Sequence, residues 1–124
     1  MSSIGRAIAF VDVLNRMASE NMPEILRKVN QKFLDCCSEY QARMSEEGEV
    51  VVDDGHEGRW GIDLGIMTEQ GKEEWREYPI WCVLRWDNEI QGDAVGGQCL
   101  FQTDDIEQLV TKFVEVVISG KKCV

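Results

Sequence analysis

The chain has 124 residues, 44% of them apolar, which is typical of one globular domain with a single core rather than of a disordered protein. Its 13 basic and 23 acidic residues give a net charge of −10, which disfavours direct binding to nucleic acid or anionic membranes and favours basic partners. No stretch approaches the ~20 consecutive apolar residues of a membrane span.

The cysteines and the N-terminal sequence indicate a cytoplasmic protein. An odd number of cysteines, two of them adjacent, argues against a disulfide framework, so we expect reduced thiols. The N-terminal apolar stretch contains Asp12 and lacks a small-residue cleavage site, so we do not interpret it as a signal peptide. The cysteines are Cys36, Cys37, Cys82, Cys99 and Cys123.

Apolar residues at helical spacing predict two helices in the first third of the chain. The first covers residues 4–18 and the second runs from about residue 23 to residue 44. The segment SENMPE, residues 19–24, separates them, because its asparagine and glutamate resemble a capping box and its proline suits a first helical turn. Gly48 is a plausible stop for the second helix.

Beyond residue 48 the apolar period changes to two, which predicts an antiparallel sheet of three to four strands. Val50–Val52 is a short β-branched run, and Trp60–Ile66 alternates as a strand with one wet face. Tyr78–Trp86 is apolar on both faces and is the expected central strand, with Pro79 at its very beginning. After a turn at residues 87–88, Ala94–Gln102 is the expected fourth strand.

The last predicted element is a helix that begins at Asp104, has Glu107 three residues on, and ends at Gly120. Its expected buried stripe is Ile106, Leu109, Val110, Phe113 and Val117. The whole chain, residues 1–124, is therefore predicted to be a single α+β domain of order ααββββα, with the helices on one face of the sheet.

Negative charge is concentrated in the C-terminal two-thirds of the chain. Residues 1–45 hold six basic and five acidic side chains, whereas residues 46–124 hold seven basic and 18 acidic ones. The stretch EGEVVVDDGHEG, Glu47–Gly58, has five carboxylates, the chain's only histidine and no base. We interpret it as a hairpin loop on a negative face, which suits a cationic partner.

A metal site at His56 is an alternative, because histidine beside carboxylates can ligate a divalent cation. Neighbours in a tight turn mostly point apart, however, and no paired-histidine or C-x-x-C spacing occurs. A calcium-like loop at Asp87–Gln98 has glutamine where the bidentate glutamate belongs. We therefore predict no metal and no cofactor.

Catalytic signatures are weak throughout the chain. The cysteines fall on apolar faces or in expected strands, no G-x-S-x-G elbow is present, and abundant carboxylates do not single out an acid–base pair. We predict that the protein is not an enzyme and assign no catalytic residue.

The aromatic residues of the predicted sheet indicate a contact surface. Trp81 has the opposite parity to Tyr78 and Trp86, so one of the two sets must face away from the helices. Exposed aromatics ringed by charge are typical of protein–protein hot spots, unless a loop or a second subunit covers them. The candidate partner-binding residues are Glu49, Asp53, Asp54, Glu57, Trp81, Arg85, Asp87, Glu89 and Asp93.

Three functional hypotheses follow. The first is an inhibitor that docks its negative surface on a basic partner, such as a nuclease toxin or another nucleic-acid-binding protein; in size, charge and class the chain is similar to the small acidic immunity proteins of bacterial toxin systems. The second is a homodimer that binds an apolar client segment, because the chain is similar in size and acidity to type III secretion chaperones, although two N-terminal helices depart from their arrangement. The third is a small metal-dependent enzyme or regulator centred on His56.

Overall fold

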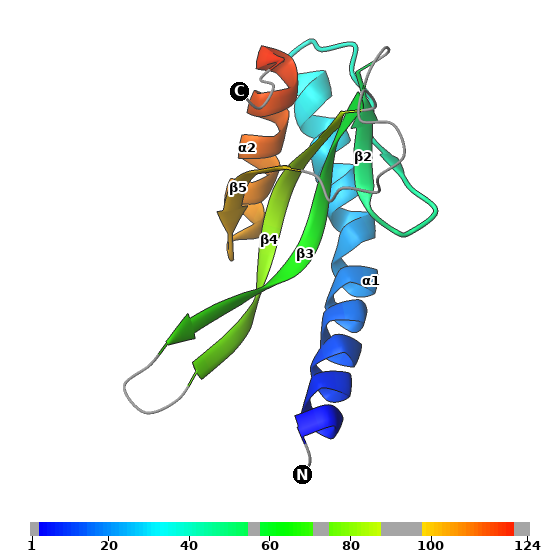
Figure 1. Cartoon of the computed structure of the whole chain (residues 1–124). Coiled ribbons are helices and arrows are strands. Elements are labelled where there is room, and N and C mark those ends of the chain that lie inside the picture. Colours follow the sequence, from blue (N-terminus) through cyan, green and yellow to red (C-terminus); the bar gives the residue numbers. More distant parts are fainter. Residues whose placement is uncertain (1–2, 55–57, 71–74, 88–97, 121–124) are drawn as a thin grey trace.

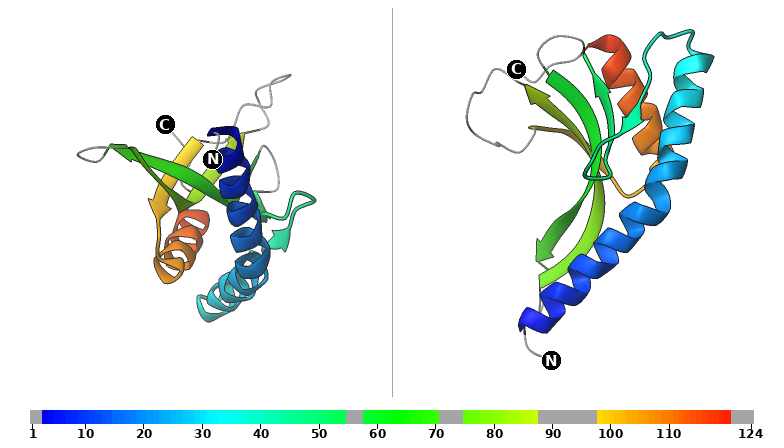
Figure 2. Two further views of the ribbon diagram at one scale, coloured as in Figure 1. Left: turned by 90° about the horizontal axis from the view of Figure 1, so that it is seen from below. Right: turned by 90° about the vertical axis from the view of Figure 1, so that its right-hand side faces the viewer.

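The structure is a computed structural model that describes residues 3–54, 58–70, 75–87 and 98–120. Five strands form one antiparallel sheet in the order β1-β2-β3-β4-β5, and both helices pack on one face of it (Figure 1; Figure 2, right). The elements are α1 (Ser3–Asp35), β1 (Arg43–Met44), β2 (Val50–Asp53), β3 (Gly58–Gln70), β4 (Trp75–Asp87), β5 (Gln98–Thr103) and α2 (Ile106–Ser119). The predicted α+β class is confirmed, but one N-terminal helix replaces the predicted two, and the sheet has five strands rather than three to four.

Helix α1 runs straight through Pro23, where a break was predicted. Met22 and Ile25 flank the proline on the buried face, exposed by 2% and 0%, and burying two such side chains offsets the ~3 kcal/mol that proline costs in a helix interior. Asn21 does not cap a second helix, because its Nδ2 donates to the carbonyl oxygen of Met17 within α1, at 2.7 Å.

Helix α1 also ends earlier than predicted, at Asp35 rather than near Met44. Cys37 adopts the left-handed conformation with φ 56°, and the N–H of Ser38 donates to the carbonyl of Phe33 at 2.9 Å, which is a Schellman motif. Glycine normally occupies this position, so cysteine gave no sequence signal for the helix end. The released chain then forms β1, the short strand that the prediction lacked.

The predicted strands fall within β2 to β5, and β4 is an interior strand between β3 and β5. Pro79 is not at its beginning, since β4 begins at Trp75 and Pro79 lies opposite Ile66. Strand β5 pairs with β4 only from Trp81 onward, so at Pro79 β4 has a neighbour on one side only and can lack a donor. The predicted turn residue 88 and strand residues 94–97 lie outside the described residues.

The register of β3 and β4 sets which side chains face the helices. Three cross-strand pairs do so: Trp60–Arg85, Ile62–Val83 and Leu64–Trp81. The core is completed by Val50 and Val52 of β2, by Met22, Ile25, Val29 and Phe33 of α1, and by Leu109, Val110, Phe113, Val114, Val116 and Val117 of α2. Trp60 therefore lies on the core face, as predicted.

Helix α2 is close to its prediction. Asp105 rather than Asp104 is the N-cap, and its side chain accepts hydrogen bonds from the N–H groups of Glu107 and Gln108. Gly120 closes the helix with φ 65°.

Candidate functional site

The outer face of the sheet, which we define as the face turned away from both helices, carries the second set of aromatics. On β4 it consists of Tyr78, Ile80, Cys82, Leu84 and Trp86, and the opposite residues of β3 are Met67, Gly65, Asp63, Gly61 and Arg59. Tyr78, Leu84 and Trp86 are partly exposed. The parity question raised by the sequence is thus resolved: Trp81 faces the core and Trp86 faces outward.

Trp86 lies flat across β3 because position 61 is glycine. A Cβ atom on Gly61 would lie 2.3 Å from Cζ3 of Trp86 and 3.4 Å from Cγ1 of Val51. The guanidinium of Arg59 sits 5.4 Å from the centroid of the Trp86 ring, a cation–π distance. The indole is therefore fixed between neighbouring side chains while it stays partly exposed.

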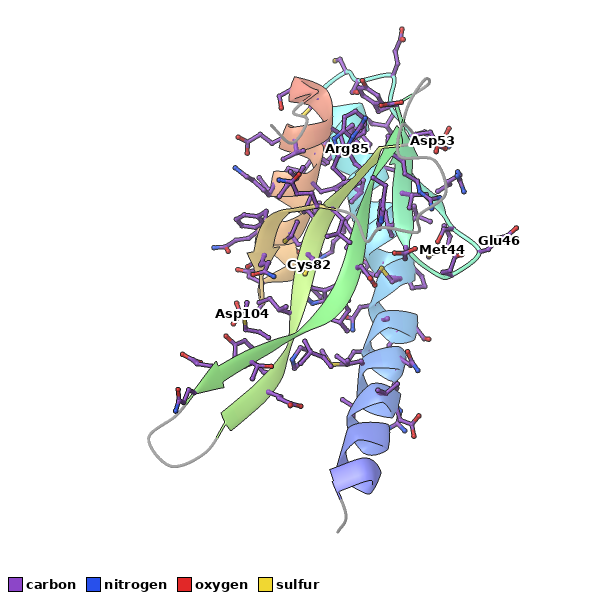
Figure 3. The ribbon with its side chains drawn as sticks, in the orientation of Figure 1. Met44, Glu46, Asp53, Cys82, Arg85 and Asp104 are labelled. Atoms are coloured by element: carbon purple, nitrogen blue, oxygen red, sulfur yellow. The ribbon has the colours of Figure 1, made fainter. Side chains whose placement is uncertain are left out.

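Beside this aromatic face lies an acidic cluster, which we define as Glu47, Glu49 and Asp63. The turn between β1 and β2 brings Glu47 and Glu49 forward; the Ser45 N–H donates to the Glu49 carbonyl at 2.7 Å, and Gly48 has φ 85°. The Val50–Ile62 register places Glu49 next to Asp63 on the outer face. Figure 3 shows neighbouring Glu46 at the tip of the same turn.

Burial raises the pKa of the Glu49 carboxyl, and the charges of Asp63 and Glu47 raise it further. Arg59 and a hydrogen bond with Ser45 act in the opposite direction but do not prevail. The raised pKa means that ionised Glu49 destabilises the free protein. A cation bound beside the carboxylate would remove this destabilisation.

Several described carboxylates outside the cluster form ion pairs within the chain. Ion pairs join Glu24 to Arg27, Glu107 to Lys28, and Asp53 to Arg43. Within residues 3–54, 58–70, 75–87 and 98–120, no ion pair reaches the acidic cluster. The cluster thus brings three described carboxylates together without a direct ion pair to any described base.

The two non-acidic candidates from the sequence, Trp81 and Arg85, lie in the core rather than on a contact surface, which corrects their prediction. They are 3% and 2% exposed, because both have the parity of Trp60. Arg85 Nη2 donates to Asp54 Oδ2 at 2.5 Å, and its guanidinium lies 4.6 Å from the centroid of the Trp60 ring. These contacts assign Arg85 to the stability of the fold.

Two acidic candidates, Asp53 and Asp54, form contacts within the fold near the connection between β2 and β3. Asp54 pairs with Arg85 and accepts the Gly58 N–H at 3.1 Å, while Asp53 is exposed and paired with Arg43. Figure 3 shows Asp53 and Arg85 toward the same end of the sheet. Asp87 ends β4 opposite Gly58, but its side chain, like Glu57, Glu89, Asp93 and His56, lies outside what the structure describes.

Sequence reasoning found Glu49 but missed Glu47, Asp63, Arg59 and Trp86 as members of one surface. The alternation of β3 already placed Asp63 on a wet face. What the sequence could not give was the β2–β3 register, which brings Asp63 beside Glu49.

Among the described side chains, no group of three or more His, Cys, Asp or Glu residues could hold a metal ion, and the hypothesis for His56 lies outside this set. Cys36, Cys37, Cys82 and Cys99 are free thiols. No helix in the described part of the chain is both long and apolar enough to cross a bilayer.

No family model, no curated protein and no solved structure matches this chain.

Proposed function

We propose that the protein is a small acidic protein-binding module that docks the outer face of its sheet onto a basic protein, in the manner of an inhibitor or immunity protein. The observation that supports this most directly is the acidic cluster, in which a half-buried Glu49 stands beside two further carboxylates and keeps a raised pKa despite the nearby Arg59. A basic partner that covers the cluster would lower the pKa of Glu49 and recover that free energy on binding.

The rest of the outer face supplies what a docking surface needs besides charge. Trp86 and Tyr78 are partly exposed aromatic side chains on an interior strand, and Trp86 is held by Arg59 and Gly61. Aromatic anchors with a charged rim are the composition of binding hot spots. Because β3 and β4 pair over their whole length, Trp86 and Tyr78 keep fixed separations from Asp63, as a preorganised surface requires.

The chemistry of the partner follows from the same arrangement. Carboxylates displayed on a rigid sheet can occupy the places that phosphate groups take on a cationic surface. The partner we propose is therefore a protein whose own ligand is a nucleic acid, such as a nuclease toxin. Catalysis is not assigned to this chain.

The test is capture of the partner from native cells by the full-length protein, followed by measurement of the affinity. The variant Glu47→Gln/Glu49→Gln/Asp63→Asn should weaken the complex at least tenfold, about 1.4 kcal/mol. The control is Glu39→Gln/Asp104→Asn/Glu115→Gln, which removes three exposed carboxylates from the helices and their flanking segments. Equal losses in both variants, or none in either, would overturn the proposal.

A second candidate function, binding of an apolar client segment, is favoured by an open cleft between α1 and the β1–β2 turn. The cleft has a volume of about 400 Å³ and is lined by Ala18, Met22, Pro23 and Met44, among others. A chaperone of this kind should bind an unfolded apolar peptide with an affinity insensitive to salt. Replacement of Met44 by glutamate should abolish that binding, and unchanged peptide affinity would exclude the cleft.

A further inference from the structure

Two apolar arms extend beyond the core of the molecule. The helix arm, defined as residues 3–17 of α1, precedes Ala18, which packs on the core. The hairpin arm, defined as the part of β3 from Leu64 and of β4 up to Ile80, has neither β2 nor β5 beside it. Figure 1 shows both arms extending in the same direction and diverging from each other.

Each arm continues a face that is buried closer to the core. Val11 and Leu14 precede Ala18, Met22 and Ile25 at helical spacings of three and four residues, yet Val11 is 48% exposed. On β3, Ile66 has the parity of the fully buried Ile62, yet it is 46% exposed. Val11 and Ile66 thus continue faces that belong to the core, yet both side chains are largely exposed.

An uncovered helix arm is poorly stabilised by itself. An isolated helical segment of this length is marginal in water, and the missing N–H of Pro23 removes one backbone hydrogen bond from α1 just beyond the arm. The arm therefore needs apolar cover from outside its own chain. The question is which molecule supplies it.

The net charges of the two arms favour a second copy of the same chain as the molecule that covers them. The whole chain carries −10, but residues 3–17 contain Arg6 and Arg16 against Asp12 alone, a balance of +1. The hairpin arm contains Glu69 and Glu77 against Arg76, a balance of −1. A second copy of this chain therefore offers each arm of the first an apolar arm of opposite sign, and the acidic remainder of its surface repels the hairpin arm.

We propose that the protein forms a two-fold homodimer in which the helix arm of each copy packs against the hairpin arm of the other. The helix arm of the first copy contacts the hairpin arm of the second, and the helix arm of the second contacts the hairpin arm of the first. The two contacts are therefore identical, as a closed two-fold interface requires. Val11 and Ile66 lie at the centre of each reciprocal contact. The proposal is independent of the function proposed for the outer face, because Val11 and Ile66 lie on the opposite side of the sheet, the side of the helices.

The size of the contact predicts a dimer that dissociates on dilution. A helix arm of this length is about 22 Å long and 10 Å wide, a strip of roughly 220 Å² in projection, and each chain contributes to two such contacts. That is modest beside the ~800 Å² per partner of a standard stable interface. The monomer should therefore be populated at low concentration.

The test is sedimentation velocity on the full-length chain over a wide concentration range. The wild type should show a monomer–dimer equilibrium, and Val11→Glu and Ile66→Glu should each raise the dimer dissociation constant at least tenfold. The matched control is Leu34→Glu, because Leu34 is on the same helix, is 69% exposed and lies outside the arm. Its dissociation constant should equal that of the wild type.

Each other outcome overturns the proposal. A wild type that stays monomeric up to its solubility limit would show that a second copy does not cover the arms, even if an apolar peptide or a detergent micelle binds them instead. Loss of the dimer in Val11→Glu but not in Ile66→Glu shows that helix arms pair with each other instead. Far-ultraviolet circular dichroism verifies that each variant is folded, which is expected because both positions are exposed in the single chain.

Discussion

Arg85 and Asp54 form a buried ion pair that joins β4 to the end of β2, with the side chains 0% and 11% exposed. The Arg85 guanidinium also lies over the ring of Trp60, so the pair is part of the core and not of its surface. Arg85 thus connects β4 both to the end of β2 and to β3.

Replacement of Arg85 by methionine should destabilise the fold by about 3 kcal/mol, because it leaves the Asp54 carboxylate without its buried partner. The matched change Arg43→Met removes an exposed pair with Asp53 and should cost less than ~1 kcal/mol. Urea denaturation measures both free energies of unfolding. Similar losses of unfolding free energy in the two variants would show that the buried pair stabilises the fold no more than the exposed pair does.

The packing of Trp86 on Gly61 predicts a position-specific effect of alanine. Gly61→Ala should displace the indole and destabilise the protein by about 1–3 kcal/mol, because the new Cβ would overlap the ring. Gly65→Ala, on the same strand and face, should cost less, since its Cβ would meet only Cys82 Sγ at 3.8 Å. Equal melting temperatures for the two variants would contradict this arrangement.

Glu49→Gln should stabilise the free protein at pH 7. The folded-state pKa of Glu49 is raised, so its ionised form is disfavoured by folding above that pKa, and glutamine removes the penalty. As the pH falls below the ordinary value of 4.5, Glu49 is protonated in both states and the advantage of glutamine should vanish. Thermal unfolding at both pH values measures the difference, and an advantage that grows on acidification would refute the cause assigned.

The thiol of Cys82 should react more slowly than that of Cys99. Burial raises the pKa of Cys82 to about 11, so little thiolate is present at pH 8, whereas Cys99 is exposed. Alkylation with iodoacetamide followed by peptide mapping compares the two sites in one sample. Faster alkylation of Cys82 than of Cys99 would show that β4 is more open than described.

The elements that the sequence predicts well are those in which local and tertiary signals agree. The alternation in Trp60–Ile66 and the apolar spacing in α2 are backed by burial, and both elements formed where expected. The predicted end of α1 was wrong because Cys37 adopts the left-handed backbone conformation, which glycine usually occupies. The break at Pro23 was wrong because burial of Met22 and Ile25 overrides a local preference.

The candidate site was less predictable for a physical reason. Charge composition indicated an acidic surface, but parity alone could not say which face of β4 the helices cover, so Trp81 and Arg85 were placed outside. Membership of the acidic cluster depends on the register between β2 and β3, which links Glu49 to Asp63. Register is set by tertiary packing, and no local pattern in this chain encodes it.

The most direct test of the central claim, that the acidic outer face receives a basic protein, is the association rate constant with the captured partner as a function of ionic strength. We predict that the rate falls at least tenfold as salt rises, and that the slope becomes shallower in Glu47→Gln/Glu49→Gln/Asp63→Asn but not in Glu39→Gln/Asp104→Asn/Glu115→Gln. A rate constant indifferent to salt, or the same slope in both triple variants, would contradict the account.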